Sequence, residues 1–281
     1  MKTVLLFPNA QKDRGLTVTR DVAALLRGLG FTCLLPAERV TDSIDDATTL
    51  PLVQALAQAE LIISIGGDGT LLQAAPAALQ TGLPLLGINA GHTGFLTELE
   101  RDELPLLGQL AQGNYQLDNR IMLDVTLTRG GRILLNRTAL NDLIVSHAGP
   151  QAVMMDLIVD GRLMMDFLGD GLIVATPTGS TGYSLSAGGP IVEPGTDCLV
   201  VTPICPHALY AHGFVLSGQR VLTLVAYSTA ERPAYCSVDG CRPIPLQEGD
   251  LVRATRSDKT VDICRLKDRQ FYDIINHKLK G

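Results

Sequence analysis

A glycine-rich turn with one carboxylate is the part of this sequence best suited to chemistry. It reads Gly66-Gly67-Asp68-Gly69-Thr70, and it lies between an apolar run at residues 61–65 and a helix-like stretch at residues 71–80. Glycines at such a turn let the backbone approach an anion, and the N–H groups and dipole of the following helix favour negative charge. Asp68 would repel a phosphate there unless it serves a metal ion or accepts a proton from an attacking hydroxyl. Phosphoryl transfer is therefore our first hypothesis, and the alternative is a structural β-turn in which Asp68 makes a local hydrogen bond.

A second glycine turn follows another short apolar strand. Residues 87–96 include Asn89, Gly91 and Gly94, but no helix pattern follows Gly94 as a dinucleotide-binding fingerprint requires. The Gly-Lys-Ser/Thr of a P-loop is also absent from the sequence. These observations disfavour a hydride-transferring dehydrogenase.

The third segment, residues 169–190, combines glycines with many hydroxyl side chains. An apolar strand begins beside Asp170 and ends in a loop that runs from Thr176 to Pro190 and contains Tyr183. The Ser and Thr residues offer donors and acceptors for ribose hydroxyls and phosphates, and Tyr183 offers a face on which a heterocycle can stack. The alternative interpretation is a solvated surface loop with Tyr183 as a core aromatic residue.

Composition and charge exclude several classes of protein. The 281 residues suggest two domains, each able to bury its own core. A net charge of −6 disfavours a nucleic-acid-binding surface, and no apolar run approaches the ~20 residues of a membrane span. The six cysteines include no C-x-x-C pair, so we expect free thiols in a reducing cytoplasm; a zinc site using Cys236 and Cys241 is the minor alternative. Residues 61–100 and 163–219 contain no Lys or Arg, so backbone amides, hydroxyls and a divalent cation must balance any bound phosphate.

The hydrophobic pattern predicts an α/β domain followed by a mainly β domain. In residues 1–115 strands alternate with helices, which is typical of a parallel sheet covered by helices. In residues 116–260 the period changes to two, and Gly130-Gly131, Asp160-Gly161 and Asp239-Gly240 are hairpin signals. The tail, residues 261–281, contains a helix-like stretch at 271–279 that we expect to pack back on the first domain.

Together these motifs resemble those of the NAD kinases, and the sequence is most similar to bacterial members. The two glycine turns, Asn141-Asp142, the run 176–190 and the run 202–207 occur in the family's order and spacing over most of the chain. The resemblance implies ATP-dependent phosphorylation of the adenosine ribose 2′-hydroxyl of NAD, giving NADP, with a divalent metal such as Mg²⁺. It also implies NAD bound between an α/β and a β-rich domain, in a homodimer or homotetramer whose sites lie near subunit interfaces.

The resemblance also assigns roles to individual residues, with Asp68 as the catalytic aspartate and no side chain named as a metal ligand. It places NAD on Gly69, Asn141, Asp142, Asp170, Thr181, Gly182, Tyr183, Ser184 and Ser186. It places the phosphates of ATP on Gly66, Gly67, Thr70, Asn89 and Gly91. Independently of the resemblance, the apolar neighbours of His207 favour a core or packing role over catalysis, and His92 is either a solvated loop residue or one that approaches the phosphates.

Three positions depart from the family pattern. Asp142 stands where Glu is more common, Gly182 stands where Ala is usual, and Leu168 lies where many bacterial members carry a basic residue. Either carboxylate can accept from a ribose hydroxyl or an adenine amino group, so we expect the role of Asp142 to survive with a shorter reach.

Two competing functions remain at this level. A lipid kinase shares the Gly-Gly-Asp-Gly turn, but it predicts a large apolar acceptor pocket instead of a hydroxyl-rich wall. A dinucleotide sensor would keep the binding residues without catalysis, but it would gain by losing the carboxylate of Asp68 near the phosphates.

Overall fold

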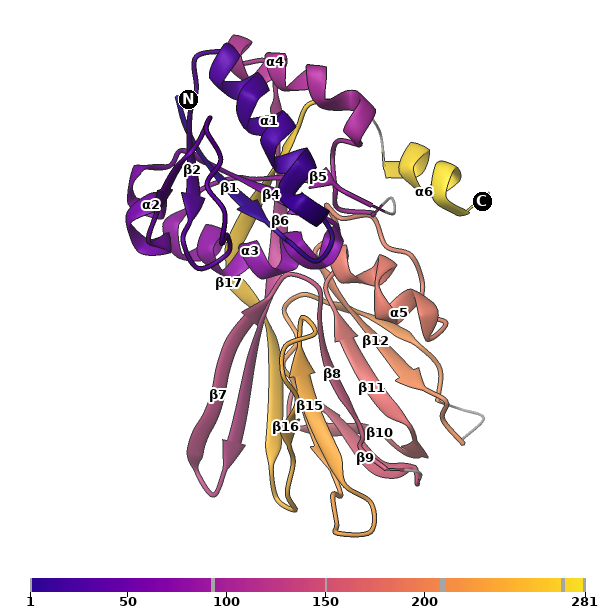
Figure 1. Cartoon of the computed structure of the whole chain (residues 1–281). Helices are drawn as coiled ribbons and strands as arrows, with labels where there is room; N and C mark the ends of the chain where they lie inside the picture. Colours follow the sequence, from indigo (N-terminus) through magenta and orange to yellow (C-terminus); the bar gives the residue numbers. More distant parts are fainter. Residues whose placement is uncertain (1, 92–93, 150, 208–210, 269–270, 280–281) are drawn as a thin grey trace. The chain divides into compact units, whose positions relative to one another are not determined.

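The computed structural model describes residues 2–91, 94–149, 151–207, 211–268 and 271–279 (Figure 1). The chain divides into two compact units, one formed by residues 1–119 and 261–281 and the other by residues 120–260. It passes between them along two long strands, β6 (Gln116–Arg129) and β17 (Leu251–Arg265). The α/β and β-rich classes expected from the sequence are both confirmed.

The first unit contains the predicted parallel sheet. Its strands lie in the order β17-β5-β4-β1-β2-β3. Their bounds are β1 (Thr3–Pro8), β2 (Thr32–Pro36), β3 (Thr48–Leu50), β4 (Leu61–Gly66) and β5 (Leu85–Asn89). All of β4 and β5 is buried, because helices cover both faces of a parallel sheet.

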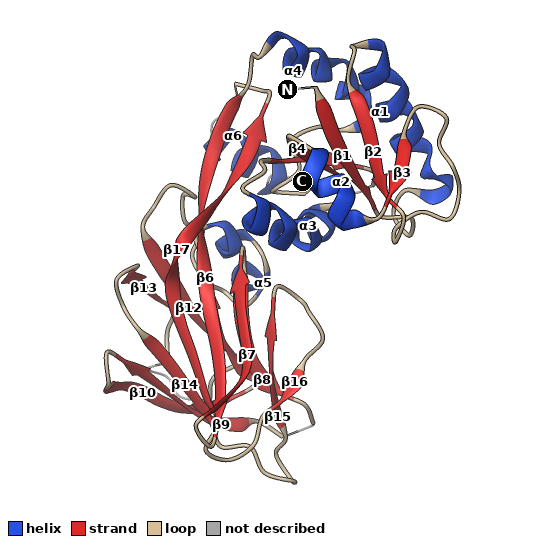
Figure 2. Ribbon diagram, turned by 90° about the vertical axis from the view of Figure 1, so that its left-hand side faces the viewer, coloured by secondary structure: helices blue, strands red, loops and turns tan. Residues whose placement is uncertain are grey.

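The helices of this unit lie on the two faces of the sheet, as Figure 2 shows. The helix α1 (Thr17–Gly28) contacts β1, β2 and the 3₁₀ helix η2 (Arg101–Leu107), which continues into α4 (Gly108–Gln112). On the other face α2 (Leu52–Gln58) contacts α3 (Asp68–Thr81). A short 3₁₀ turn, η1 (Arg14–Leu16), precedes α1, and α6 (Phe271–Leu279) lies where the sequence predicts a final helix.

The strand order reverses between β1 and β4. From β1 the sheet continues through β2 and β3 on one side and through β4 and β5 on the other. Ligands of such sheets bind outside the carboxyl ends of the strands at this point of reversal. Asn9 follows β1 and Thr70 follows β4, and Asn9 Nδ2 donates to Thr70 Oγ1 over 3.1 Å. The first glycine turn therefore lies at the topological position where a ligand is expected.

A buried carboxylate, Glu98, binds the segment at the end of β17 within the first unit. Glu98 Oε1 accepts the backbone N–H groups of Leu266 and Lys267 over 2.9 and 2.8 Å, and Arg265 forms an ion pair with Glu98 at 3.2 Å. These contacts join the segment after the second glycine turn to the end of β17.

The second unit is built from two antiparallel β layers. One is a six-stranded sheet in the order β13-β12-β11-β8-β15-β16. Its strands are β8 (Asp142–His147), β11 (Gly171–Ala175), β12 (Cys198–Ile204), β13 (Phe214–Ser217), β15 (Ala234–Val238) and β16 (Ile244–Pro245). The other layer pairs β10 (Arg162–Gly169), β9 (Val153–Val159), β14 (Leu222–Ala226) and β17, and β6 also pairs with β17 and with β7 (Arg132–Ala139).

The alternation of apolar residues explains this packing. Leu172 and Val174 belong to the large core shared with residues of β6, β9 and β14, whereas Ile173 and Ala175 lie in a smaller cluster on the opposite face. The three expected hairpin turns are confirmed, because they connect the antiparallel pairs β6–β7, β9–β10 and β15–β16.

Candidate functional site

Asp68 occupies the first turn of α3, three residues before the start that the hydrophobic pattern predicts. Its Oδ2 accepts the N–H of Phe95 over 2.6 Å, and its Oδ1 accepts the N–H groups of Leu96 and Thr97 over 3.0 and 3.2 Å. A carboxylate near a helix N-terminus is favoured by the helix dipole. Asp68 thus joins the two glycine turns, and Oδ2, with one backbone donor, keeps acceptor capacity for a hydroxyl or a cation.

Gly94 is required for this arrangement. A Cβ atom built on Gly94 would lie 1.8 Å from Asp68 Oδ1, so no other residue fits beside the carboxylate as it stands. Gly66 is constrained in the same way, since a Cβ there would lie 2.2 Å from Thr70 Oγ1. Gly67 and Gly69 have open space around them, which leaves their backbone approachable.

The side chains of Thr70 and Asn89, two other residues assigned to the phosphates, form hydrogen bonds within the protein. Thr70 is buried, and its hydroxyl oxygen accepts from Asn9 and from the N–H of Gly67. Asn89 is also buried; its Nδ2 donates to Glu100 over 2.7 Å and its Oδ1 accepts the N–H of Gly91 over 2.9 Å. Thr70 and Asn89 therefore shape the two turns, and the backbone is the part of this edge that can hold phosphate. His92 lies outside the described residues.

Arg39 is a cation at this edge of the sheet that the sequence analysis missed. Its guanidinium lies 3.6 Å from the centre of the Phe7 ring and donates to the carbonyl oxygen of Pro8 and to Gln73 Oε1 of α3. Positive charge was considered only within residues 61–100 and 163–219, whereas Arg39 reaches the end of β1 and Gln73 of α3 from the segment after β2. Burial lowers the pKa of Arg39.

In the second unit Asn141 and Asp142 precede and open β8. Asn141 Oδ1 is buried and has no hydrogen-bond partner among the described residues. An unpaired buried acceptor costs about 1–3 kcal/mol, so this oxygen is suited to receive a donor from a ligand. Asp142 is also buried, and burial together with the negative charge of Asp239 raises its pKa to about 7. This pair therefore supplies an amide and a carboxyl group beside one another.

Many hydroxyl groups of residues 176–186 fold the segment itself. Thr176 Oγ1 donates to the carbonyl oxygen of Leu140 over 2.6 Å, Ser180 Oγ donates to that of Pro177 over 2.6 Å, and Ser184 Oγ bonds with Thr202 Oγ1 over 2.8 Å. Ser184, which the resemblance assigns to NAD, is fully buried. The expected loop in fact contains two short helices, η3 (Thr178–Thr181) and α5 (Tyr183–Ser186).

Part of the same segment faces outward or touches the Asn141-Asp142 pair. Tyr183 is 45% exposed and Ser186 is also exposed, while Thr181 Oγ1 donates to the carbonyl oxygen of Thr178 over 3.2 Å. A Cβ on Gly182 would lie 3.2 Å from the Gly179 carbonyl oxygen, so the alanine usual in the family is tight here. The ring of Tyr183 is exposed, so its face is accessible to a heterocycle.

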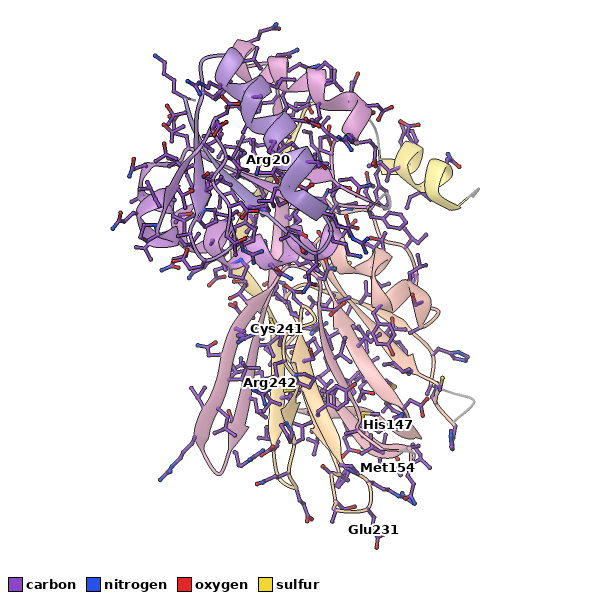
Figure 3. The ribbon with its side chains drawn as sticks, viewed as in Figure 1. Arg20, His147, Met154, Glu231, Cys241 and Arg242 are labelled. Atoms are coloured by element: carbon purple, nitrogen blue, oxygen red, sulfur yellow. The ribbon has the colours of Figure 1, made fainter. Side chains whose placement is uncertain are left out.

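Asp170 lies beside a histidine and a cysteine, and after burial its charge is one of those that raise the pKa of Tyr183 in this segment. It precedes β11, and its carboxylate is 3.6 Å from Nε2 of His147, which is labelled in Figure 3. A hydrogen bond with Asp170 raises the pKa of the exposed Cys205 thiol, which therefore stays protonated. The side chain of His207 is exposed, so the expected core or packing role is wrong for it, and its backbone N–H donates to the carbonyl oxygen of Leu168 over 2.8 Å.

The described residues contain no group of three or more His, Cys, Asp or Glu side chains placed to hold a metal ion. Cys236 is buried and Cys241 exposed, and both are free thiols, so the minor zinc hypothesis gains no support. None of the described helices is long and apolar enough to cross a membrane.

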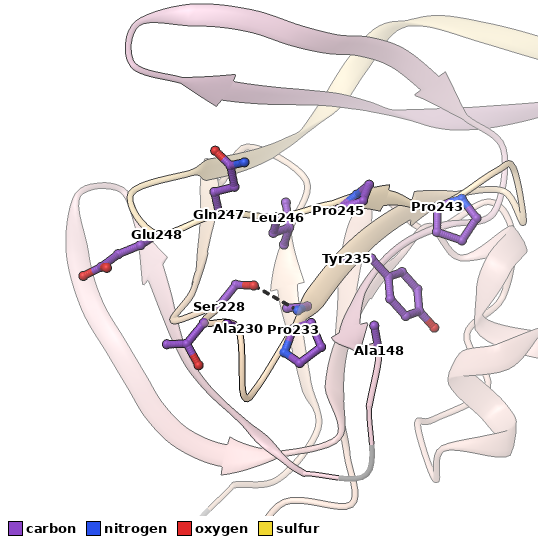
Figure 4. A pocket seen from close by; sticks show the side chains of 12 residues that line it. Ala148, Ser228, Ala230, Pro233, Tyr235, Pro243, Pro245, Leu246, Gln247 and Glu248 are labelled. Atoms are coloured by element: carbon purple, nitrogen blue, oxygen red, sulfur yellow. Dashed lines mark hydrogen bonds between the residues drawn. The ribbon is translucent and has the colours of Figure 1, made fainter.

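A separate apolar cavity of about 520 Å³ lies in the second unit (Figure 4). Its lining includes Pro233, Tyr235, Pro243, Pro245 and Leu246, and none of the residues assigned to NAD or ATP. This apolar cavity is therefore not built from the motif residues.

Comparison with known proteins identifies the family. Residues 16–115 match the ATP-NAD kinase N-terminal domain and residues 140–266 match the ATP-NAD kinase C-terminal domain. The NAD kinase of Symbiobacterium thermophilum is 41% identical over 286 residues, covering 100% of both chains. The NAD kinase of Moorella thermoacetica is 42% identical over 224 residues, covering 79% of this chain and 71% of that protein.

Two solved structures share the fold. Yeast NADH kinase complexed with NADH superposes with a TM-score of 0.84 and 22% identity, covering 100% of this chain and 88% of that one. An NAD kinase from Archaeoglobus fulgidus in complex with ATP has a TM-score of 0.73 and 24% identity, covering 100% and 99%. With both family domains and full-length relatives matched, the chain belongs to the NAD kinase family, a family of ATP-dependent kinases.

Proposed function

We propose that this chain transfers the terminal phosphate of ATP to the 2′-hydroxyl of the adenosine ribose of NAD, giving NADP and ADP. The observation that carries the proposal is the carboxylate of Asp68, held by three backbone N–H groups at the point of strand reversal in a family of NAD kinases. In the reaction the 2′-oxygen forms a bond to the γ-phosphorus, the bond to the β–γ bridging oxygen breaks, and the hydroxyl proton passes to Asp68.

The first unit is suited to the phosphate donor. Gly67 and Gly69 leave the start of α3 approachable, and the first turn of any helix has N–H groups without intrahelical acceptors. These groups favour the phosphates of ATP, and Arg39 adds a positive charge at the same edge of the sheet.

The second unit is suited to the dinucleotide. Asn141 supplies the unpaired acceptor and Asp142 a carboxyl group, while Tyr183 supplies an exposed ring for stacking. A ribose hydroxyl or an adenine amino group would donate a hydrogen bond to the buried oxygen of Asn141, whereas the hydrocarbon tail of a lipid has no donor for it.

A divalent cation, taken as Mg²⁺, is part of the proposal. Mg²⁺ in kinases is commonly bound through one or two carboxylates together with substrate phosphates, and such a site needs no cluster of protein ligands. Three backbone N–H groups leave the Asp68 carboxylate one acceptor site, which the hydroxyl takes in the proposed step, so the cation would be held mainly by the substrate phosphates, whose charge it would neutralise.

Following the family, we also propose that the protein works in the cytoplasm as a homodimer or homotetramer. Light scattering on the purified protein measures the subunit number directly.

The substrate class is tested by offering the protein one acceptor at a time. Purified protein receives radiolabelled ATP, Mg²⁺ and either NAD, diacylglycerol or a sphingoid base, and the products are separated by chromatography. We expect label in NADP only, and label in lipid with none in NADP would refute the proposal.

A further inference from the structure

Asp239 makes contacts that neither the reaction nor the resemblance assigns. It begins the Asp239-Gly240 turn after β15, with a left-handed φ of 48°. Its Oδ2 accepts the N–H of Leu140 over 2.7 Å, and its Oδ1 accepts those of Asn141 and Asp142 over 2.8 and 3.0 Å. Its own N–H donates to the carbonyl oxygen of Asp142 over 3.0 Å. The carboxylate therefore holds the backbone from which both candidate dinucleotide-binding side chains project.

A turn does not by itself require these contacts. Asp160 has the same left-handed conformation, at φ 49°, and the same following glycine. Its carboxylate is bound to the N–H of Val221 and to Arg220, at an exposed hairpin end. The Asp-Gly turn is thus common to both sites, whereas hydrogen bonds to the backbone of residues 140–142 are made by Asp239.

The second effect of Asp239 is electrostatic. The pKa of Asp142 is raised to about 7, first by burial and then by the charge of Asp239, while burial raises the pKa of Asp239 and its three N–H bonds oppose that change. The loop packed against this pair, residues 176–182, has no ionisable side chain. Ala175 of β11, which pairs with Asp142, has no ionisable side chain. Neither does Leu143 of β8 or its partner Val238 of β15.

A cation, Arg120, contacts the loop that packs against Asp142. Arg120 donates to Thr178 Oγ1 of that loop over 3.2 Å, and Tyr183 is the next ionisable residue after the loop along the chain. Asp239 is accordingly the charge that acts on Asp142. Just beyond the turn, Cys241 and Arg242, labelled in Figure 3, are exposed.

We propose that Asp239 is a positioning residue for dinucleotide recognition, which acts through the Leu140–Asp142 backbone and through its charge on Asp142. The inference rests on the proposed function, because it deepens the assignment of Asn141 and Asp142 to NAD. Asp239 itself touches no reacting atom. Its carboxylate holds the backbone that carries the amide and the carboxyl group, and its charge adds to the effect of burial in raising the pH at which Asp142 loses its proton.

The test variant is Asp239→Asn, measured for NAD binding by calorimetry and for steady-state kinetics between pH 5.5 and 9. The amide keeps one acceptor oxygen, so at least one N–H of the three loses its acceptor, and the KM for NAD should rise about ten-fold at high pH with kcat nearly unchanged. Removing the charge also lowers the pKa of Asp142, so the loss of NAD affinity on the acid side should move to lower pH.

Asp160→Asn is the matched control, since it makes the same change in the same kind of turn away from both candidate residues. The proposal is overturned if Asp239→Asn matches this control in its KM for NAD and in its pH profile. A protein that lost only stability would show neither the split between KM and kcat nor the shift with pH.

The experiment also distinguishes failure of the proposed function and failure of the variant to fold from failure of the inference. If the wild-type protein makes no NADP, the proposed function fails, independently of Asp239. If Asp239→Asn does not fold, Asp142→Asn with Asp239 intact takes its place. The acid-side loss of NAD affinity should then disappear, and its persistence would overturn the inference.

Discussion

Asp68→Asn is the perturbation that best separates chemistry from architecture at the first glycine turn. The amide preserves size but cannot take a proton or balance a cation. Loss of a general base lowers turnover by about 10²–10⁴, or roughly 3–5 kcal/mol of barrier. We expect a fall in kcat of that size, while NAD still binds, and more tightly once the repulsion between Asp68 and its pyrophosphate is gone.

The structure adds a cost in stability that must be measured separately. Asp68 accepts three N–H bonds, and an amide offers one acceptor oxygen; if Oδ1 is kept, the N–H of Phe95 loses this acceptor. That loss amounts to about 1–3 kcal/mol of unfolding free energy. Turnover is followed by coupling NADP formation to an NADP-specific dehydrogenase, and unfolding is followed by thermal denaturation.

Asp13→Asn is the matched control for this experiment. Asp13 is a buried carboxylate of the same unit that accepts the N–H groups of Val18 and Thr19 over 3.0 and 2.9 Å and the Thr19 hydroxyl over 2.6 Å. Its replacement should reduce stability without a comparable loss of turnover per folded molecule. If Asp68→Asn keeps near-wild-type turnover at ordinary Mg²⁺, Asp68 is only a turn residue. Partial recovery at high Mg²⁺ would instead assign it to the cation alone.

Three further outcomes test other parts of the site. Asp142→Ala should raise the KM for NAD by roughly ten- to a hundred-fold, with little change in that for ATP, as a lost charge-assisted hydrogen bond predicts; an unchanged constant in kinetic assays would place Asp142 outside the site. Gly94→Ala should lower turnover as much as Asp68→Asn, because the new Cβ would overlap the carboxylate at 1.8 Å, and normal kinetics would contradict that geometry. Asp142→Asn should stabilise the protein more at pH 8 than at pH 5, measured by thermal denaturation. The pKa of Asp142 is raised from 3.8 to about 7 in the folded state, so the folded state binds more protons between these values, and stability falls as pH rises through them. An equal effect at both pH values would mean that Asp142 titrates normally.

The sequence predicted those features that depend on local pattern. Alternating apolar runs and glycine turns placed Gly66 to Thr70 after a buried strand, and three hairpin turns were recognised from their residues alone. The start of α3 was placed too late, because Gly67, Asp68 and Gly69 have low intrinsic helix propensity, although Asp68 lies in the first helical turn.

The sequence did not predict the contacts that join distant segments. Asp68 reaches the backbone of residues 95–97, and Asp239 reaches residues 140–142 from 97 to 99 positions away. A carboxylate beside glycine has the same local sequence pattern whether its oxygens accept bonds at an exposed hairpin end, as at Asp160, or from the backbone of residues 140–142, as at Asp239. The hydroxyl-rich segment was likewise interpreted as a binding wall, whereas Thr176, Ser180 and Ser184 use their hydroxyls to fold it.

The position of the transferred phosphate tests the central claim most directly. Purified protein is incubated with ATP, Mg²⁺ and NAD, and the dinucleotide product is compared with authentic 2′- and 3′-phosphorylated standards by ³¹P NMR and chromatography. We expect a single product with its phosphate on the 2′-oxygen of the adenosine ribose. A 3′-phosphate, or consumption of ATP with unmodified NAD, would contradict that claim.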